Sequence, residues 1–366
     1  MNGLKGILVV VGLVAGVLSL ATGIWQVPLQ LGFVLTALLV LLLYWRLWPA
    51  NPLVFSLCLA VLSTAGAWSS LHTLSLESLG VQYWSSVVLA WSVAWLFVEQ
   101  LSDQHTLNRW LGTALRIVIP LVFGVWLLVL WEIFTRGMNV PQVLLPSPSL
   151  IADRFASSIP ILWADFKQTF LKAVLIGYAM GCGAGFFVAI LIDRSPFLQR
   201  GLLPVGNLVS ALPIVGVAPI MVMWFGFDWP SKAAVVVVMT FFPMLVNTVS
   251  GLAAAGTMQK DLMKSYAANY WQTLFKLRLP EALPFIFNAL KINSTLALIG
   301  AIVAEFFGTP IVGMGFRIST EVGRMNVDMV WAEIAVAALA GSLFYGLIAL
   351  VERAMTFWHP SVRGRT

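Results

Sequence analysis

Ten apolar segments, each close to twenty residues long, limit what this chain can fold into. About 20 consecutive apolar residues form a helix that crosses the hydrocarbon core of a bilayer. A helix also satisfies its own backbone hydrogen bonds there, which irregular chain cannot do. The sequence therefore predicts an all-α polytopic membrane protein with about ten transmembrane helices. The segments lie near residues 6–24, 30–48, 53–71, 81–98, 114–135, 168–192, 203–226, 232–253, 284–308 and 333–356.

Composition agrees with a membrane protein and excludes several functions. Hydrophobic residues make up 60% of the chain and charged residues 10%, whereas about 25% of the residues of a soluble domain are charged. The net charge of +6 is attributed to basic residues that orient the helices, so no nucleic-acid partner is predicted. Both cysteines, Cys58 and Cys182, lie in apolar segments, and the three histidines are far apart. Neither a disulfide, a metal site nor a histidine catalytic cluster is predicted.

Basic residues also set the expected orientation of the helices. Lys5 precedes the first apolar segment, but no small-residue cleavage site follows, so we expect a retained helix rather than a signal peptide. With the N-terminus in the cytoplasm, most Lys and Arg residues, together with the polar loop 254–282, fall on the cytoplasmic side. The positive-inside rule requires this bias. We therefore expect both termini in the cytoplasm.

A polar stretch, SDQHTLNRWLG within residues 100–113, interrupts the apolar pattern and divides the chain. We interpret it as a cytoplasmic linker between an accessory bundle of four transmembrane helices, residues 1–99, and a six-helix domain, residues 114–366. The accessory bundle either alters assembly and the choice of partner or only packs in the membrane with no role in transport. The sequence leaves both alternatives open.

The polar loop at residues 254–282 is the longest charged interruption of the second half. Because it separates two membrane-length segments, it must lie in water or at the headgroup surface. Apolar residues recur at helical spacing from Asp261 to Leu279, which predicts an amphipathic helix lying on the membrane surface. Pro280 and Pro284 are expected to begin the next helix, since proline is tolerated at a helix start. The alternative is a solvated basic loop without a partner.

The segment DLMKSYAANYWQTLFKLRLP, residues 261–280, resembles the cytoplasmic coupling loop of permeases from ABC importers. That family pattern has an acidic residue, two small residues, a glycine and a closing Leu-Pro. The chain matches at Leu279-Pro280 but has Asp261 for the usual Glu and Ala267 for the usual glycine. In the family this loop docks on the ATP-hydrolysing subunit. The resemblance assigns docking to Asp261, Lys264, Ala267, Ala268, Trp271, Leu279 and Pro280.

From Thr113 onward the chain resembles the six-helix permease domain of type I ABC importers. It is most similar to the nitrate, taurine and alkanesulfonate branch, which also takes up small heteroaromatic precursors. LLPSPSLIADRF at 144–155 and LALIGAIVAEFFGTPIVGMGF at 296–316 carry this resemblance. It implies a permease subunit in a bacterial plasma (inner) membrane that moves a pyrimidine-like or vitamin-precursor-like solute, or a sulfonate, nitrate or taurine.

Several residues are candidates for the translocation path. Gly177, Gly181 and Gly185 recur every four residues on one helix face, where they either line the path or let another helix pack closely. Glu305 is an ionisable residue in an apolar span, which is costly and so suggests a role in the path or its outer gate. The alternative for Glu305 is a carboxylate paired with a neighbouring helix. The remaining candidates are Pro213 and Pro219, which break the backbone hydrogen-bond ladder, and Asn247.

The sequence contains no Gly-x-x-x-x-Gly-Lys-Ser/Thr phosphate loop, so the energy source must be another subunit. The resemblance implies that ATP and Mg²⁺ bind partner ATPase subunits, that a second permease copy or paralogue pairs with this chain, and that a periplasmic or extracellular solute-binding protein delivers the solute. No catalytic residue is predicted. An ion-coupled secondary transporter would need several ionisable groups near the midplane, and a membrane-embedded enzyme would need convergent catalytic side chains. Both remain alternatives.

Overall fold

The computed structural model describes residues 3–22, 28–46, 52–72, 80–102, 109–210, 213–308 and 311–358. Within these ranges every regular element is a helix, which confirms the all-α fold. The chain forms two compact units, Met1–Leu150 and Ile151–Thr366. Residues 103–108 of the predicted linker lie outside the described residues, so the border predicted between the accessory bundle and the permease domain stays a prediction.

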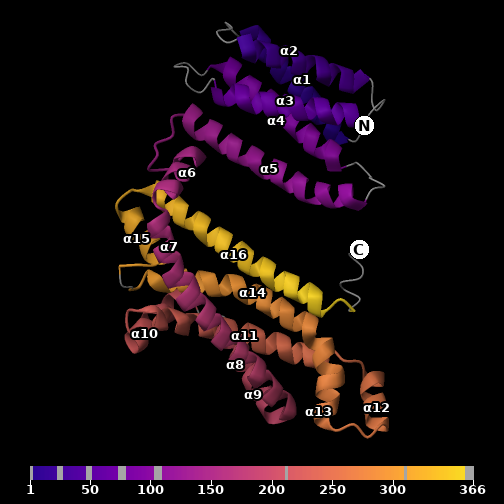
Figure 1. Cartoon of the computed structure of the whole chain (residues 1–366), viewed down its shortest axis with the longest axis vertical. Helices are drawn as coiled ribbons and strands as arrows, with labels where there is room; N and C mark the ends of the chain where they lie inside the picture. Colours follow the sequence, from indigo (N-terminus) through magenta and orange to yellow (C-terminus); the bar gives the residue numbers. More distant parts are fainter. Residues whose placement is uncertain are drawn as a thin grey trace. The chain divides into compact units, whose positions relative to one another are not determined.

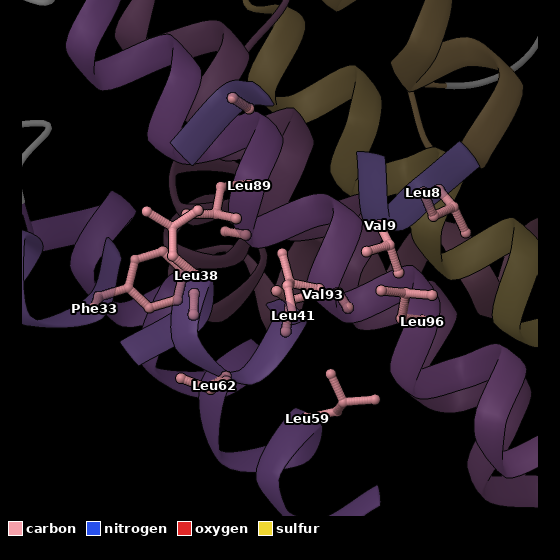
Figure 2. Close-up of a cluster of buried hydrophobic side chains, with 14 of the residues drawn as sticks. Leu8, Val9, Phe33, Leu38, Leu41, Leu59, Leu62, Leu89, Val93 and Leu96 are labelled. Carbon is pink, nitrogen blue, oxygen red and sulfur yellow. The ribbon is translucent and has the colours of Figure 1, made fainter. Parts of the chain in front are cut away.

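The first unit is a bundle in which α1 and α3 pack on α4. Its core is aliphatic, and Figure 2 shows Leu41, Leu89 and Val93 gathered between the helices. Small residues allow close approach: a Cβ on Gly66 would lie 2.8 Å from the Cβ of Ala90. Close packing of this kind drives helix association in lipid, where hydrophobic burial does not. The helices are α1 Gly3–Thr22, α2 Pro28–Arg46, α3 Pro52–His72, α4 Val81–Ser102 and α5 Arg109–Gly137.

The second unit is built around α11, which contacts α8 on one side and α14 on the other. The helix α14 packs in turn on α16, and α12 and α13 lie at the opposite end of α14 from α15 (Figure 1). The elements are α6 Pro148–Ser157, α7 Ile159–Phe166, the π-helical segment η2 Lys167–Val174, α8 Leu175–Arg194, α9 Pro196–Ser210, α10 Ile214–Phe225, α11 Trp229–Ala253, α12 Thr257–Ser265, α13 Tyr270–Thr273, the π-helical segment η3 Leu274–Arg278, α14 Leu279–Glu305, α15 Met314–Gly323 and α16 Val327–Met355.

Each of the ten predicted segments is mostly helical where the structure describes it. Among the described residues, six helices are long and apolar enough to cross a membrane, and four shorter ones are apolar. The protein is therefore a multi-pass membrane protein. The six long helices are Val81–Ser102, Leu115–Gly137, Ile159–Arg194, Trp229–Ala253, Tyr270–Glu305 and Val327–Met355, and the four shorter ones are Lys5–Ala21, Leu31–Tyr44, Cys58–Leu71 and Ile214–Phe225.

The segment predicted at 203–226 is broken, as its three prolines indicated. The helix α9 ends at Ser210 and α10 begins at Ile214, with Pro213 in an extended conformation directly before it. A proline cannot donate a backbone hydrogen bond, so it is tolerated at this boundary. The resulting α10 has 12 residues.

Candidate functional site: the polar segment and the buried carboxylates

The polar segment, residues 254–282, is folded differently from the sequence prediction. One continuous surface helix from Asp261 to Leu279 is wrong, because the helix stops at Ser265 and restarts at Tyr270. Ala267 has a φ of 54°, a left-handed conformation that ends a right-handed helix. Asn269 then starts α13 by accepting a hydrogen bond from the backbone of Gln272 at 2.8 Å and donating its own backbone N–H to the Gln272 side chain at 2.9 Å. This reciprocal capping fixes the new helix start.

The prediction that Pro280 and Pro284 begin the next helix is confirmed for Pro280, which lies in the first turn of α14, whereas Pro284 lies inside that helix. The chain is helical without a break from Tyr270 to Glu305 and passes through both prolines. A proline inside a helix removes one backbone hydrogen bond and crowds the preceding turn. The π-helical turn at Leu274–Arg278 stands directly before Leu279-Pro280, and such wider turns accommodate a disturbed hydrogen-bond ladder.

The docking residues predicted on α12 and α13 lie mostly at the surface. Asp261 and Lys264 form an exposed ion pair at 3.0 Å. Ala268 closes the turn by donating its N–H to the Met263 carbonyl. Trp271 is half exposed and stacks on Phe275. Leu279 and Pro280 are half-buried at the start of α14.

The apolar spacing predicted for this segment includes Leu262 and Tyr266 but not Met258, and α12 leaves all three exposed. None of its residues is buried. Met258 and Leu262 on α12, and Tyr266 directly after it, are 84%, 57% and 79% exposed, and their four-residue spacing places them on one face. Exposed apolar side chains that share a face mark a surface that a partner protein or a membrane covers. We call Met258, Leu262 and Tyr266 the α12 face.

An ion pair joins the polar segment to the end of α8. Arg278 donates two parallel hydrogen bonds to Asp193, at 2.7 Å from Nη1 to Oδ2 and 2.6 Å from Nη2 to Oδ1. Its Nε donates to the Leu252 carbonyl at the end of α11, and the Tyr270 hydroxyl donates to Asp193 Oδ2 at 2.9 Å. We call these four residues the Asp193 clamp. The sequence shows only a charged residue after an apolar segment and does not indicate its partner.

The glycine stripe lies between α8 and α11. Gly177, Gly181 and Gly185 are buried, and a Cβ on Gly177 would come within 2.7 Å of the Ala233 carbonyl oxygen. At Gly185 the corresponding contact, with the Phe241 carbonyl oxygen, would be 2.5 Å. These contacts favour the packing alternative. A role of the stripe in the translocation path stays a prediction.

The other path candidates lie beside or within α10 and on α11. Pro213 is exposed at the break before α10, and Pro219 is half-buried inside α10. Asn247 donates its side-chain amide to the Pro243 carbonyl of its own helix at 2.8 Å. These placements leave their predicted role untested.

Glu305 ends α14 and is buried in a network of hydrogen bonds. The Thr169 hydroxyl donates to its Oε1 and the Gly315 backbone N–H to its Oε2, both at 2.7 Å. Thr169 also accepts the N–H of Met314 at 2.8 Å. These bonds hold the start of α15 against α14 and η2, and the positive end of the α15 dipole faces the carboxylate.

A second buried carboxylate supports the same loop. Asp165 on α7 accepts the Gly313 N–H at 2.6 Å and the Arg317 Nε–H at 2.9 Å. Gly313 has a φ of 146°, a backbone conformation that residues other than glycine rarely adopt. A Cβ at this position would also lie 2.8 Å from the Glu305 carboxylate. Buried charges need such partners. The contacts therefore favour the interpretation of Glu305 as a paired carboxylate, and its role in the path stays a prediction.

Buried Lys232 adds a positive charge near this network. Its ammonium donates to the carbonyl oxygens of Phe227 and Gly308 and interacts electrostatically with Glu305. Among the described residues, no group of three or more His, Cys, Asp or Glu side chains could hold a metal ion.

Membrane-length helices around α11, with an exposed polar segment between two of them, define a polytopic membrane protein. Residues 177–357 match the family described as the inner membrane component of binding-protein-dependent transport systems. The chain belongs to this family and is the permease subunit of an ABC importer of the nitrate and taurine branch. This confirms the resemblance found in the sequence.

Curated relatives have the same role with different solutes. The chain is 32% identical to the riboflavin transport system permease protein of Chloroflexus aurantiacus over 259 residues, which cover 70% of this chain and 95% of the relative. It is 31% identical to the formylaminopyrimidine transport permease protein of Halalkalibacterium halodurans, over 65% of this chain and 95% of the relative. It is 26% identical to the taurine transport system permease protein of Escherichia coli, over 73% and 99%.

Proposed function

We propose that the polar segment of this permease is the cytoplasmic docking site of an ATPase subunit, and that the chain itself binds no ATP. The α12 face carries this proposal, because three exposed apolar side chains beside the exposed Asp261–Lys264 ion pair are typical of a surface that binds another protein. The segment also joins α11 to α14, two membrane-length helices. A partner that moves α12 therefore displaces both helices.

The proposed assembly contains two permease chains, either two copies or this chain and a paralogue. Two ATPase subunits supply ATP and Mg²⁺ chemistry, and a solute-binding protein delivers the solute from the far side of the membrane. Most basic residues lie with the polar segment and both termini on the proposed cytoplasmic side of a bacterial inner membrane. No catalytic residue is assigned to this chain.

A docking test compares Leu262→Glu with Leu262→Met in the complete complex reconstituted in lipid nanodiscs. A carboxylate on the α12 face should abolish the stimulation of ATP hydrolysis by the loaded binding protein, because burying an unpaired charge at an interface is costly. Methionine keeps an apolar side chain and should retain stimulation. Asp261→Lys should also lose it. Full stimulation in Leu262→Glu, with the ATPase still copurifying, would contradict docking at this face.

For the solute, we propose a small heteroaromatic compound of the pyrimidine or flavin type. Relatives named for riboflavin and formylaminopyrimidine are 32% and 31% identical, whereas those named for taurine and nitrate are 26% identical. Uptake into proteoliposomes should be measured with riboflavin, formylaminopyrimidine and taurine, each with ATP inside the vesicles. Uptake of taurine alone would contradict this class, and uptake without the ATPase would contradict the importer mechanism.

A further inference from the structure

The charged pair of the Asp193 clamp is largely shielded from water, and each guanidinium nitrogen donates one hydrogen bond. The side chains of Arg278 and Asp193 are only 17% and 11% exposed. Every nitrogen of the Arg278 guanidinium donates to a different acceptor atom: Nη1 and Nη2 to the two oxygens of Asp193, and Nε to the Leu252 carbonyl. A planar fork held at all of its nitrogens has one orientation only. The clamp therefore fixes the position of η3 relative to the ends of α8 and α11.

The location of Asp193 is unfavourable for α8 on its own. It is the penultimate residue of that helix, which ends at Arg194, and a negative charge near a helix C-terminus opposes the helix dipole. Arg278, 85 residues further along the chain, compensates this charge. A residue that opposes its local structure and is compensated from a distant segment is typical of a functional position.

Apolar contacts also join the polar segment to α8, but they differ from the clamp in kind. Leu274 is fully buried in a cluster that includes Cys182 of α8, with Tyr270 and Ile190 at its edge. Apolar contact is non-directional, so such surfaces can slide past one another. Paired charge-assisted hydrogen bonds keep one register. The clamp is thus the directional connection between η3 and α8.

We infer that Asp193 and Arg278 are positioning residues that pass the displacement of α12 and α13 on to α8 and α11. ATP hydrolysis is then coupled to solute movement through α8 and α11 as well as through α14. The inference rests on the proposed docking of an ATPase on the α12 face. Tyr270 supports the clamp with one further hydrogen bond to Asp193 Oδ2. Its contribution is smaller because Arg278 alone satisfies both carboxylate oxygens.

The test uses the complete complex in proteoliposomes and measures two rates: ATP hydrolysis and uptake of whichever of riboflavin, formylaminopyrimidine and taurine the unchanged complex transports. Arg278→Lys keeps the charge and loses the fork, and Asp193→Asn keeps the shape and loses the charge. Both should lower the number of molecules transported per ATP by about 2- to 30-fold, the range for residues that carry coupling. Tyr270→Phe should lower it less.

A charge exchange separates coupling from folding. The double variant Asp193→Arg with Arg278→Asp should recover part of the lost transport per ATP, because it restores an ion pair between the same two segments. Exposed Arg200 on α9 provides the matched control, and Arg200→Ala should leave the ratio unchanged. Thermal unfolding of each complex identifies variants that fail to fold. If Arg278→Lys or Asp193→Asn fails to fold, transport per ATP is measured with the milder variant Tyr270→Phe.

Three outcomes are distinguishable. If the clamp variants transport as many molecules per ATP as the unchanged complex, or lose only thermal stability, the inference is overturned. If Leu262→Glu loses stimulation while the clamp variants keep full coupling, docking holds and only the clamp's role fails. If Leu262→Glu keeps stimulation, the proposed docking itself fails.

Discussion

Substituting alanine at Gly185 tests how closely α8 approaches α11. A Cβ at this position would lie 2.5 Å from the Phe241 carbonyl oxygen, 3.0 Å from the Met244 Cβ and 3.3 Å from the Leu245 nitrogen. Two of these are main-chain atoms of α11, which cannot rotate away as a side chain can. Gly183, two residues earlier on α8, has nothing within 4 Å of the same added atom. It provides a matched control on the same helix.

The expected magnitude follows from comparing the two substitutions. An ordinary contact needs about 0.9 Å more room than the Gly185 position offers, and overpacking of this kind costs about 1 to 3 kcal/mol. Alanine also improves helix propensity over glycine by about 1 kcal/mol at both positions. This gain cancels in the comparison. Gly185→Ala should therefore be about 1 to 3 kcal/mol less stable than Gly183→Ala, which is about 5- to 150-fold in the unfolding equilibrium.

Unfolding of the purified variants by increasing SDS in mixed micelles, followed by circular dichroism, measures this difference. Gly177→Ala should shift in the same direction as Gly185→Ala, because its Cβ would lie 2.7 Å from the Ala233 carbonyl oxygen. Equal stability of Gly185→Ala and Gly183→Ala would refute the close approach of the two helices. A loss of transport in Gly185→Ala at unchanged stability would instead favour the path role for this glycine.

Three further substitutions test the polar segment and the buried carboxylates. Ala267→Gly should stabilise the turn by about 0.5 to 1 kcal/mol, because glycine adopts the positive φ that strains alanine. Slower amide hydrogen exchange at the turn would show this stabilisation. Arg317→Ala should cost about 3 to 5 kcal/mol by leaving buried Asp165 without its charged partner. Arg324→Ala, at a pair whose arginine is 64% exposed, should cost under about 1 kcal/mol, and thermal unfolding compares the two variants. Glu305→Gln should cost about 1 to 3 kcal/mol, since the amide NH2 would face one of the two donors that now bond to separate carboxylate oxygens. Equal melting temperatures would contradict this.

The sequence was sufficient to predict the helices but not where the polar segment breaks. Apolar length decides whether a segment crosses a bilayer, and length is read directly from the chain. The break at Ala267 was hidden because alanine favours helix, and the apolar spacing continues on both sides of it. The clearest local signal was Asn269 followed by Gln272, a capping pattern that could have placed the new helix start.

Ion pairs were the least predictable part of the candidate sites. Asp193 and Arg278 are 85 residues apart, and Asp165 and Arg317 are 152 apart. Each pair forms because distant helices pack against one another, and no periodicity of one segment reports that packing. Burial of Glu305 was expected from its apolar surroundings. Its partner Thr169 was not identified, because a threonine in an apolar segment has many possible roles.

Polar links at three levels bind α14 to its neighbours along its whole length. Directly before the first residue of α14, Arg278 bonds to Asp193 of α8. In the middle of α14, Asn293 donates to the Thr240 carbonyl of α11 at 2.8 Å. At the end of α14, Glu305 accepts a hydrogen bond from Thr169. Helices joined by directional bonds at both ends and in the middle cannot slide without breaking several bonds at once. A displacement imposed on α12 and α13 should therefore reach Glu305 and the start of α15 with little loss, which would connect the proposed docking surface to the far end of the second unit.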